Sequence, residues 1–196
     1  MANNKTNGLL FVIAAPSGAG KTTVTNQAIK RLNPEFDISK VRTSTTRQLR
    51  TGEIDGKDYD FLSIQEFEKR EKEGLFLETT KYSGALYGSP ISVLANMQKG
   101  KSFIIVTDLP GVHELKKTIP FATFIWITVP NIDELKNRLL KRETTDKNHV
   151  EKRLKLAEEE IKEAKKPRLF DFQMVNDIFE QTVEELCELI KNQMNK

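Results

Sequence analysis

Near the start of this 196-residue chain lies the segment Ala15-Pro16-Ser17-Gly18-Ala19-Gly20-Lys21-Thr22. The apolar run 9–14 before it predicts a buried strand, and the residues from Thr23 onward predict a helix. A strand, a glycine-rich turn, a Lys-Thr pair and a helix N-terminus together form the phosphate-binding P-loop. The alternative is an incidental glycine-rich turn, since the usual pattern begins with glycine and this one begins with Ala15. We expect residues 15–23 to bind a nucleoside triphosphate.

The residue types of this loop suit a phosphate ligand. Gly18 and Gly20 leave room for backbone N–H groups to converge on phosphate oxygens, because neither has a Cβ. The positive end of the following helix favours the same anion. Lys21 would place its ammonium on the β- and γ-phosphates, and the Thr22 hydroxyl would ligate Mg²⁺.

Composition describes an ordinary globular protein. The chain is 38% hydrophobic and 30% charged. Its net charge of +3 is small, and basic residues alternate with acidic ones throughout, so we expect no nucleic-acid partner. A single cysteine, Cys187, fits a reducing compartment and excludes an internal disulfide. No apolar run approaches the roughly 20 residues of a membrane helix, and the polar start lacks a signal-peptide core. We expect a cytoplasmic protein with no membrane partner.

Apolar runs and helical patterns alternate along most of the chain. This rhythm predicts an α/β fold, with a parallel sheet of about five strands and helices on both of its faces. Besides 9–14, the expected buried strands are 38–41, 102–107, 122–129 and 172–175. The expected helices are 91–99, 111–117, 132–141, 148–165 and 183–194.

The segment 42–90 breaks this rhythm. It holds short strand-like pieces at 59–62 and 76–80 and one helix at 64–72, which indicates a small, mostly antiparallel insertion. Elsewhere, the charged run 158–166 pairs acids with bases at helical spacing and predicts a solvated helix face.

The insertion carries Thr45-Thr46-Arg47-Gln48-Leu49-Arg50-Thr51-Gly52-Glu53-Ile54-Asp55-Gly56-Lys57-Asp58-Tyr59-Asp60-Phe61. This segment resembles the signature of guanylate kinases, in which Thr-Thr-Arg, a second Arg, an acid, a Gly and a Tyr occur at fixed offsets. All these offsets are met, although Leu49 replaces a frequent proline. The segments 76–78 and 87–89 also match the family, and the similarity extends from about Gly8 to Asp177.

The resemblance implies a P-loop kinase fold and a reaction. The chain would be a single domain, 1–196, with a core of about 1–41 and 91–196. A GMP-binding insertion would span about 42–90, and a helical lid about 138–153. The implied reaction is Mg²⁺-dependent transfer of the ATP γ-phosphate to GMP or dGMP, in purine nucleotide metabolism.

Four residues of the insertion suit the phosphate of the acceptor. Arg47 and Arg50 can clamp a dianionic phosphate with forked hydrogen bonds. Tyr59 and Tyr87 can each donate a hydroxyl hydrogen bond to the same oxygens. The alternative for both tyrosines is a half-buried packing role.

Guanine recognition needs an acceptor for N1–H and N2–H₂ and a donor for O6. The Glu78 carboxylate accepts two parallel donors, whereas adenine lacks this donor pair. In the family the O6 donor is usually Ser; here it would be Thr43, and Ser89 would also bind GMP. Asp108 would assist guanine binding or hold a water on Mg²⁺. The family's preceding aspartate is replaced by Val106.

The resemblance also implies residues around ATP. Arg138 and Arg142 resemble lid arginines that close over the transferring phosphoryl group. The alternative is that they pair with Glu134 or with Glu143, which replaces a family glycine. Arg153 is a third candidate, and Asn176 would lie beside adenine.

Two other functions remain open. A related P-loop kinase acting on a ribose bisphosphate would have little use for Glu78 and Thr43. A non-catalytic, protein-binding module of the same fold typically loses the P-loop lysine, whereas Lys21 is present. Three further side chains have structural interpretations: His113 and His149 as surface residues, and Trp126 as a packing residue. Cys187 lies on an apolar helical stripe and is expected in the core.

Overall fold

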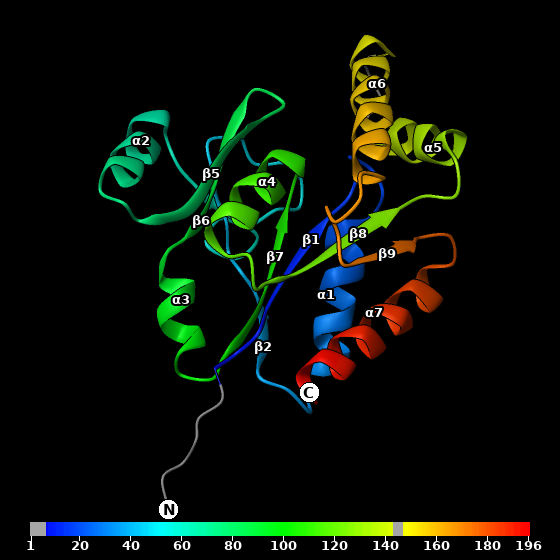
Figure 1. The fold of residues 1–196 in the computed structure, drawn as a ribbon. Helices are drawn as coiled ribbons and strands as arrows, with labels where there is room; N and C mark the ends of the chain where they lie inside the picture. The colour runs from blue at the N-terminus through cyan, green and yellow to red at the C-terminus, as the bar shows by residue number, and fades with distance from the viewer. Residues whose placement is uncertain (1–6, 143–146) are drawn as a thin grey trace, which may run out of the picture. The chain divides into compact units, whose positions relative to one another are not determined.

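The computed structural model describes residues 7–142 and 147–196, with the side chains of 141, 142 and 147–149 outside the description. Strands and helices alternate along the chain (Figure 1). In chain order the elements are β1 (Leu10–Ala14), α1 (Lys21–Leu32), β2 (Ile38–Lys40), β3 (Ser44–Thr45), β4 (Asp60–Phe61), α2 (Ile64–Lys72), β5 (Phe76–Tyr82), β6 (Ala85–Pro90), α3 (Ser92–Met97), β7 (Ser102–Thr107), α4 (Leu109–Thr118), β8 (Thr123–Thr128), α5 (Ile132–Arg142), α6 (Lys147–Ala164), β9 (Phe172–Val175) and α7 (Phe179–Met194).

The predicted parallel sheet of five strands is confirmed. Its order is β2-β7-β1-β8-β9, and β2 pairs with β7, and β8 with β9, in parallel. All five residues of the central strand β1 are buried. The prediction that 172–175 is a buried strand is wrong in one respect. Only Met174 of β9 is buried, because β9 lies at the edge of the sheet.

The segment 42–90 forms a second sheet, of order β4-β3-β6-β5. Strand β6 is antiparallel to both β3 and β5, whereas the short β3 and β4 are parallel. Helix α2 covers this sheet with Phe67, which is fully buried and stacks on the Phe76 ring at 4.7 Å between centroids. The α2 helix has the predicted bounds, and its N-cap Ser63 accepts a hydrogen bond from the N–H of Glu66 at 3.1 Å.

The chain divides into two compact units. The first comprises the chain up to Phe11 and Asp37–Ala122, and so contains the second sheet, α3, β7 and α4. The second comprises Val12–Phe36 and Thr123–Lys196, and contains α1 and all elements from β8 to α7.

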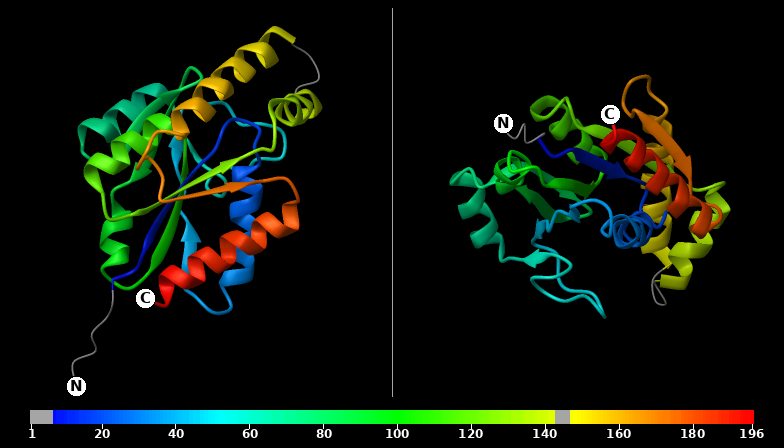
Figure 2. Two further views of the ribbon diagram at one scale, coloured as in Figure 1. Left: turned by 45° about the vertical axis from the view of Figure 1, so that its right-hand side comes forward. Right: turned by 90° about the horizontal axis from the view of Figure 1, so that it is seen from below.

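Helices α1 and α7 pack against each other in the second unit (Figures 1 and 2). Arg31 forms ion pairs with Glu180 and Glu184 across this contact. Cys187 is 3% exposed and lies 3.8 Å from the carbonyl of Ala28, so its predicted core position is confirmed.

Two further expectations concern the packing of Trp126 and the solvated face of 158–166. Trp126 is buried and contacts Phe170 with ring centroids 5.2 Å apart, which confirms a packing role. The run 158–166 has the predicted solvated face, on which Glu158, Glu159, Lys162, Lys165 and Lys166 are exposed, but Glu160 does not belong to that face. Glu160 is 4% exposed because it shares a buried stripe of α6 with Ala157 and Ala164.

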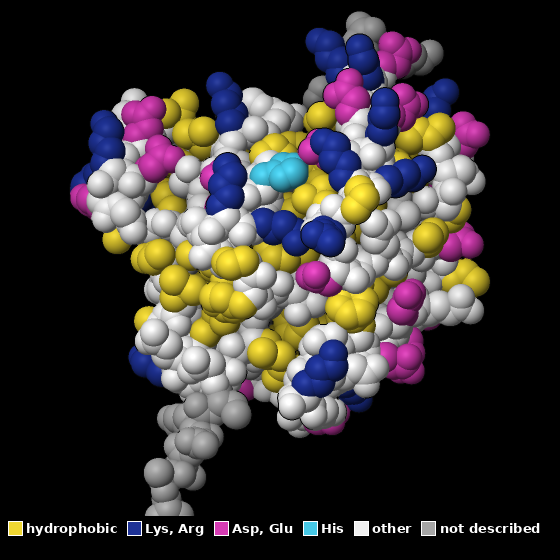
Figure 3. Space-filling view, in the orientation of Figure 1, with side chains coloured by type: hydrophobic (Ala, Val, Ile, Leu, Met, Phe, Trp, Pro, Cys, Tyr) yellow, Lys and Arg dark blue, Asp and Glu magenta, His cyan; other side chains and the backbone are white. Residues whose placement is uncertain are grey.

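Basic and acidic side chains are mixed on the face drawn in Figure 3. His113 is half-buried on α4, and His149 lies outside the described side chains. None of the helices in the described residues has the length and apolar character that crossing a membrane requires.

Phe67→Ala should lower the free energy of unfolding by about 3–5 kcal/mol, because it empties the fully buried contact between α2 and Phe76. Ile64→Ala, on the same helix at a side chain 57% exposed, should change it by about 0.5 kcal/mol or less. Urea unfolding followed by circular dichroism measures both. Equal unfolding midpoints for the two variants would contradict the packing of Phe67 against Phe76.

Candidate active site

The P-loop joins β1 to α1 through two glycines whose conformation excludes side chains. Gly18 has φ +93° and Gly20 has φ +89°, a left-handed region that L-residues rarely adopt. A Cβ on Gly18 would lie 2.9 Å from Cδ2 of Leu139, and one on Gly20 would lie 2.7 Å from Nδ2 of Asn176. Both positions therefore require glycine on backbone and steric grounds.

Helix α1 begins directly after this loop, and its N-cap Gly20 provides no side-chain cap. Its first N–H groups lack intrahelical acceptors, apart from the bond of Val24 N–H to the Gly20 carbonyl at 3.0 Å. Lys21 is partly exposed, and its ammonium donates to the carbonyl of Ala15 at 3.4 Å. The helix end and Lys21 together provide positive potential at one place.

Asn176 follows β9 and is fixed against the P-loop. Its side chain is 5% exposed, and Nδ2 donates to the carbonyl of Ala19 at 2.7 Å. Its Oδ1 is buried and accepts no hydrogen bond from the described residues. This oxygen is a free acceptor beside the loop, in the place where the sequence predicted adenine contact.

Two of the predicted arginines contact this region. Arg138 on α5 donates from Nε to Glu134 at 2.9 Å and from Nη2 to the carbonyl of Asn176 at 3.0 Å. Arg153 on α6 donates to the hydroxyl of Ser17 in the P-loop. Arg138 therefore forms the ion pair with Glu134 that was the alternative to a lid role, while it also reaches the Asn176 backbone. Arg142 ends α5, and its side chain lies outside the described residues.

In the other unit, Arg47 and Glu53 form a forked ion pair. Two guanidinium nitrogens of Arg47 each lie 2.8 Å from a different oxygen of Glu53. Glu53 also accepts from the backbone N–H of Arg50 at 2.9 Å, while the Arg50 side chain is exposed. One carboxylate thus orients both predicted clamp residues. The sequence signature contains this acid, but its role as the partner of Arg47 was not predicted.

Two aromatic rings adjoin the Arg47 guanidinium. Its central carbon lies 5.1 Å from the ring centroid of Tyr59 and 5.4 Å from that of Phe61. Tyr59 and Tyr87 meet edge to face at 6.3 Å, and both are half-buried. Burial raises the pKa of Tyr59 above its ordinary value of 10.0, and the neighbouring Tyr87 acts in the same direction. Tyr59 therefore remains a neutral hydroxyl at physiological pH.

Glu78 on β5 is a buried carboxylate with one satisfied oxygen. It is 6% exposed, and Oε1 accepts from the hydroxyl of Ser89, its direct neighbour on β6, at 2.8 Å. Its Oε2 is buried and has no hydrogen-bond partner in the described part of the chain. Burial raises the pKa of Glu78 to about 7, the Ser89 bond opposes this, and the charge of Asp108 adds to it.

Asp108 has a structural role that the sequence did not predict. It caps the N-terminus of α4, accepting from the N–H of Gly111 at 2.9 Å, and the Thr80 hydroxyl lies 3.4 Å from its other oxygen. This cap starts α4 at Leu109, two residues before the expected start, because Pro110 is tolerated in a first helical turn. Thr43 is 7% exposed, and its carbonyl accepts from Asp60 N–H at 3.0 Å.

The predicted residues thus fall into two groups, one in each unit. The unit that contains α1 holds the residues predicted around ATP, and the unit that contains the second sheet holds those predicted around GMP. The first group is Ala15, Pro16, Ser17, Gly18, Ala19, Gly20, Lys21, Thr22, Thr23, Arg138, Arg153 and Asn176. The second group is Thr43, Arg47, Arg50, Tyr59, Glu78, Tyr87, Ser89 and Asp108.

Comparison with known proteins gives one consistent result. The family model described as guanylate kinase matches residues 7–193. A guanylate kinase of Clostridium tetani is 40% identical over 93% of this chain and 85% of its own length, and one of Caldanaerobacter subterraneus is 37% identical over 95% and 88%. The crystal structure of a guanylate kinase from Anaplasma phagocytophilum superposes with a TM-score of 0.80 at 28% identity, covering 97% of this chain and 88% of that one. The chain therefore belongs to the guanylate kinase family.

Proposed function

We propose that this protein transfers the γ-phosphate of ATP to GMP, giving ADP and GDP, with the P-loop unit binding the donor and the unit of the second sheet binding the acceptor. Guanylate kinases are ATP:GMP phosphotransferases, and the chain spans most of the length of its relatives in that family. A kinase for a ribose bisphosphate and a non-catalytic binding module are not favoured, because Lys21 and Glu78 are both retained.

The observation that carries the proposal is the state of Glu78. A buried carboxylate oxygen without a partner costs free energy unless a ligand supplies donors. Guanine offers N1–H and N2–H₂ side by side on one edge, which match such an acceptor. Adenine has no such pair of donors and would leave the carboxylate unpaired. Ser89, which is fully buried, acts through Glu78 by fixing its other oxygen, and Thr43 would donate to O6.

The acceptor phosphate would be held by Arg47, Arg50, Tyr59 and Tyr87. Arg47 is already oriented by Glu53 and by the Tyr59 ring, so little ordering remains to be done when the ligand arrives. The two tyrosine hydroxyls would add directional donors to the charged ones. Together they would fix the attacking phosphate oxygen, and positioning of this kind supplies much of the rate in phosphoryl transfer.

The donor side would use the P-loop N–H groups, Lys21 and Thr22. The Thr22 hydroxyl makes no hydrogen bond within the described residues, and no cluster of three or more His, Cys, Asp or Glu side chains there could hold a metal alone. The Thr22 hydroxyl would hold Mg²⁺ that arrives with ATP. When bound, the ion offsets charge on the phosphate oxygens. The free Oδ1 of Asn176 would accept the exocyclic amine of adenine.

Arg138, Arg142 and Arg153 are proposed to neutralise charge on the transferring phosphoryl group. Arg153 contacts Ser17 and Arg138 contacts Asn176, so two guanidiniums already contact residues of the ATP-binding group. Arg138 would exchange its bond to Glu134 for one to phosphate. Exclusion of water by a closing lid would suppress ATP hydrolysis.

A coupled assay of ADP release tests the function directly. We expect ATP turnover with GMP and dGMP, and little with AMP, UMP or a ribose bisphosphate. Absence of a GMP-dependent signal would refute the proposed reaction, and turnover with a ribose bisphosphate alone would support the alternative kinase.

Glu78→Gln should lower kcat/KM for GMP by about a hundredfold or more, because an amide NH₂ would face the guanine donors. The KM for ATP should stay within about twofold of that of the wild type, since the ATP-binding residues are untouched. Glu71→Gln is a matched control. Glu71 on α2 is an exposed carboxylate that accepts a hydrogen bond from Thr79, the neighbour of Glu78 on β5. Equal effects of both variants, or equal losses for GMP and ATP, would show that Glu78 does not read guanine.

Guanosine binding should weaken about tenfold between pH 8 and pH 6. The pKa of Glu78 is about 7 in the free protein, so acid conditions place a proton on the carboxyl and remove the acceptor. Guanosine is the appropriate probe because the phosphate of GMP itself titrates near pH 6. Calorimetry across this range should give a sloping profile for the wild type and a flat one for Glu78→Gln. A flat wild-type profile would argue against ionised Glu78 as the acceptor.

A further inference from the structure

We propose that Lys40 supplies a third cation to the phosphate of the acceptor nucleotide, beside Arg47 and Arg50. This inference rests on the proposed function and adds a residue that neither the P-loop nor the signature of the insertion contains. Its starting point is the position of Lys40, the last residue of β2. Strand β2 pairs in parallel with β7, which ends at Thr107 just before Asp108. Lys40 therefore lies at the carboxyl edge of the sheet, where ligands of α/β proteins bind.

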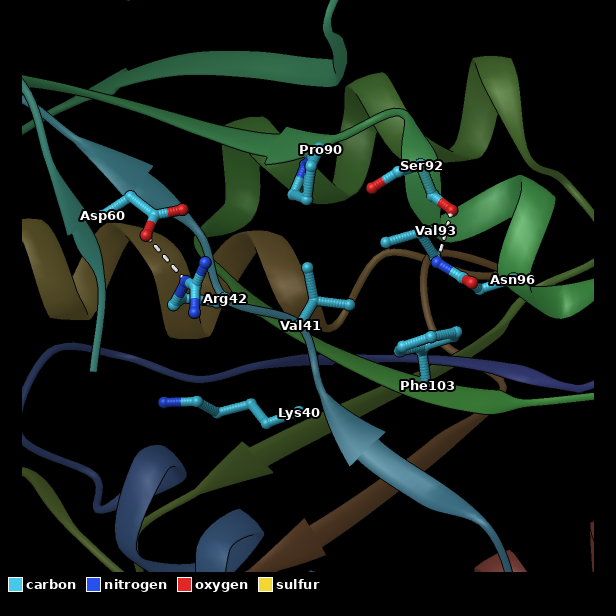
Figure 4. A pocket seen from close by; sticks show the side chains of 9 residues that line it. All are labelled: Lys40, Val41, Arg42, Asp60, Pro90, Ser92, Val93, Asn96 and Phe103. Carbon is cyan, nitrogen blue, oxygen red and sulfur yellow. Dashed lines mark hydrogen bonds and ion pairs between the residues drawn. The ribbon is translucent and has the colours of Figure 1, made fainter. Parts of the chain in front are cut away.

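The Lys40 ammonium adjoins the acceptor clamp. Its Nζ lies 5.8 Å from the ring centroid of Tyr59, the same ring that the Arg47 guanidinium approaches at 5.1 Å. Lys40 also contributes to the pocket of Figure 4, but its ammonium points away from Val93, Asn96 and Phe103 in that view. The pocket's other cation, Arg42, is engaged by Asp60 at 2.7 Å and by the carbonyl of Gly56 at 2.7 Å.

The ammonium of Lys40 is half-buried and has no direct anionic partner. Within the described residues it makes no hydrogen bond and no ion pair within 4.0 Å. Burial lowers the pKa of Lys40, and the charges of Asp58 and Glu53, which lie beyond ion-pair distance, oppose this shift. A half-buried cation that lacks a partner gains most from an anion supplied by a ligand.

The local balance of charge indicates which anion this is. Glu53 pairs with Arg47, whereas Asp58 acts on Lys40 from beyond ion-pair distance, so the three cations Lys40, Arg47 and Arg50 exceed these two carboxylates by one positive charge. Without it, a dianionic phosphate would enter a neutral group of side chains. With it, the phosphate meets a cation that makes no direct ion pair with any carboxylate of the described residues.

The test compares Lys40→Met with Lys101→Met. Lys101 is a matched control in the same unit: its Nζ lies 5.8 Å from the ring centroid of Phe103, and 3.8 Å from a carboxylate oxygen of Asp37. Lys40→Met should raise the KM for GMP about ten- to a hundredfold, which is the loss of one charge-assisted hydrogen bond. The KM for ATP and the Kd for guanosine should change less than twofold, because neither involves the acceptor phosphate. Lys101→Met should leave all three constants unchanged.

Each other outcome is informative. An unchanged KM for GMP in Lys40→Met would overturn the inference, and so would an equal loss of guanosine affinity, which would indicate a structural role. If the wild type uses GMP in either case, the proposed reaction stands while the role of Lys40 falls. If the wild type shows no transfer to GMP, the reaction itself is wrong, and the inference falls with it.

A pH profile provides a readout that a purely structural role would not change. Because burial lowers the pKa of Lys40, its charge is lost at a lower pH than that of an ordinary lysine. The charged and titratable side chains around it are Glu53, Asp58, Asp60, Arg42, Arg47 and Tyr59, and burial raises the pKa of Tyr59. The kcat/KM for GMP should fall at alkaline pH, and Lys40→Arg should shift this fall to higher pH. Superimposable profiles would contradict the proposal.

Discussion

The close approach of two chain segments to the P-loop is the constraint on which the ATP-binding unit depends. Asn176, at the end of β9, holds the Ala19 carbonyl, and its amide occupies the space where a side chain on Gly20 would lie. Leu139 of α5 occupies the corresponding space at Gly18. The loop is therefore shaped by tertiary contacts as much as by its own backbone. The same contacts bring the Arg138 helix and the Asn176 backbone to the phosphate-binding end of α1.

In the other unit, the main constraint is the free-energy cost of burying the Glu78 carboxylate. Ionisation of Glu78 is unfavourable in the folded protein, so stability is lost as the pH rises from its ordinary pKa of 4.5 through about 7. The hydrogen bond from Ser89 offsets only part of the free-energy cost of ionising Glu78, and the nearby charge of Asp108 increases that cost. A ligand with two adjacent N–H donors offsets what remains. The proposed selectivity for guanine would then follow from the Glu78 oxygen that the described residues leave without a donor.

Local sequence patterns predicted most of the architecture, whereas the candidate residues rest on the P-loop pattern and on the resemblance to guanylate kinases, and their roles stay predictions. The α/β class, the five-stranded parallel sheet and the exact bounds of α2, β7 and β9 could be predicted from periodicity and turn residues. Strand β3 was missed because it has two residues, and β6 because Gly88 and Pro90 are poor strand formers. The burial of Glu160 and the exposure of β9 depend on which elements pack beside them. A single sequence does not contain that information.

A single sequence also does not show which side chains pair within the candidate site. These pairings explain why several carboxylates can lie near a proposed site for a dianionic phosphate. Composition cannot show that Glu53 holds Arg47 in a forked pair or that Asp108 caps α4. Once each carboxylate is assigned its partner, the acids no longer oppose the ligand: Glu53 orients a guanidinium, Asp108 accepts from a backbone N–H and lies beside the Thr80 hydroxyl, and Glu78 is proposed to accept from the base. The electrostatics of the acceptor unit are then set by the cations that remain unpaired. Lys40 is one whose burial and position beside Tyr59 favour a phosphate over water.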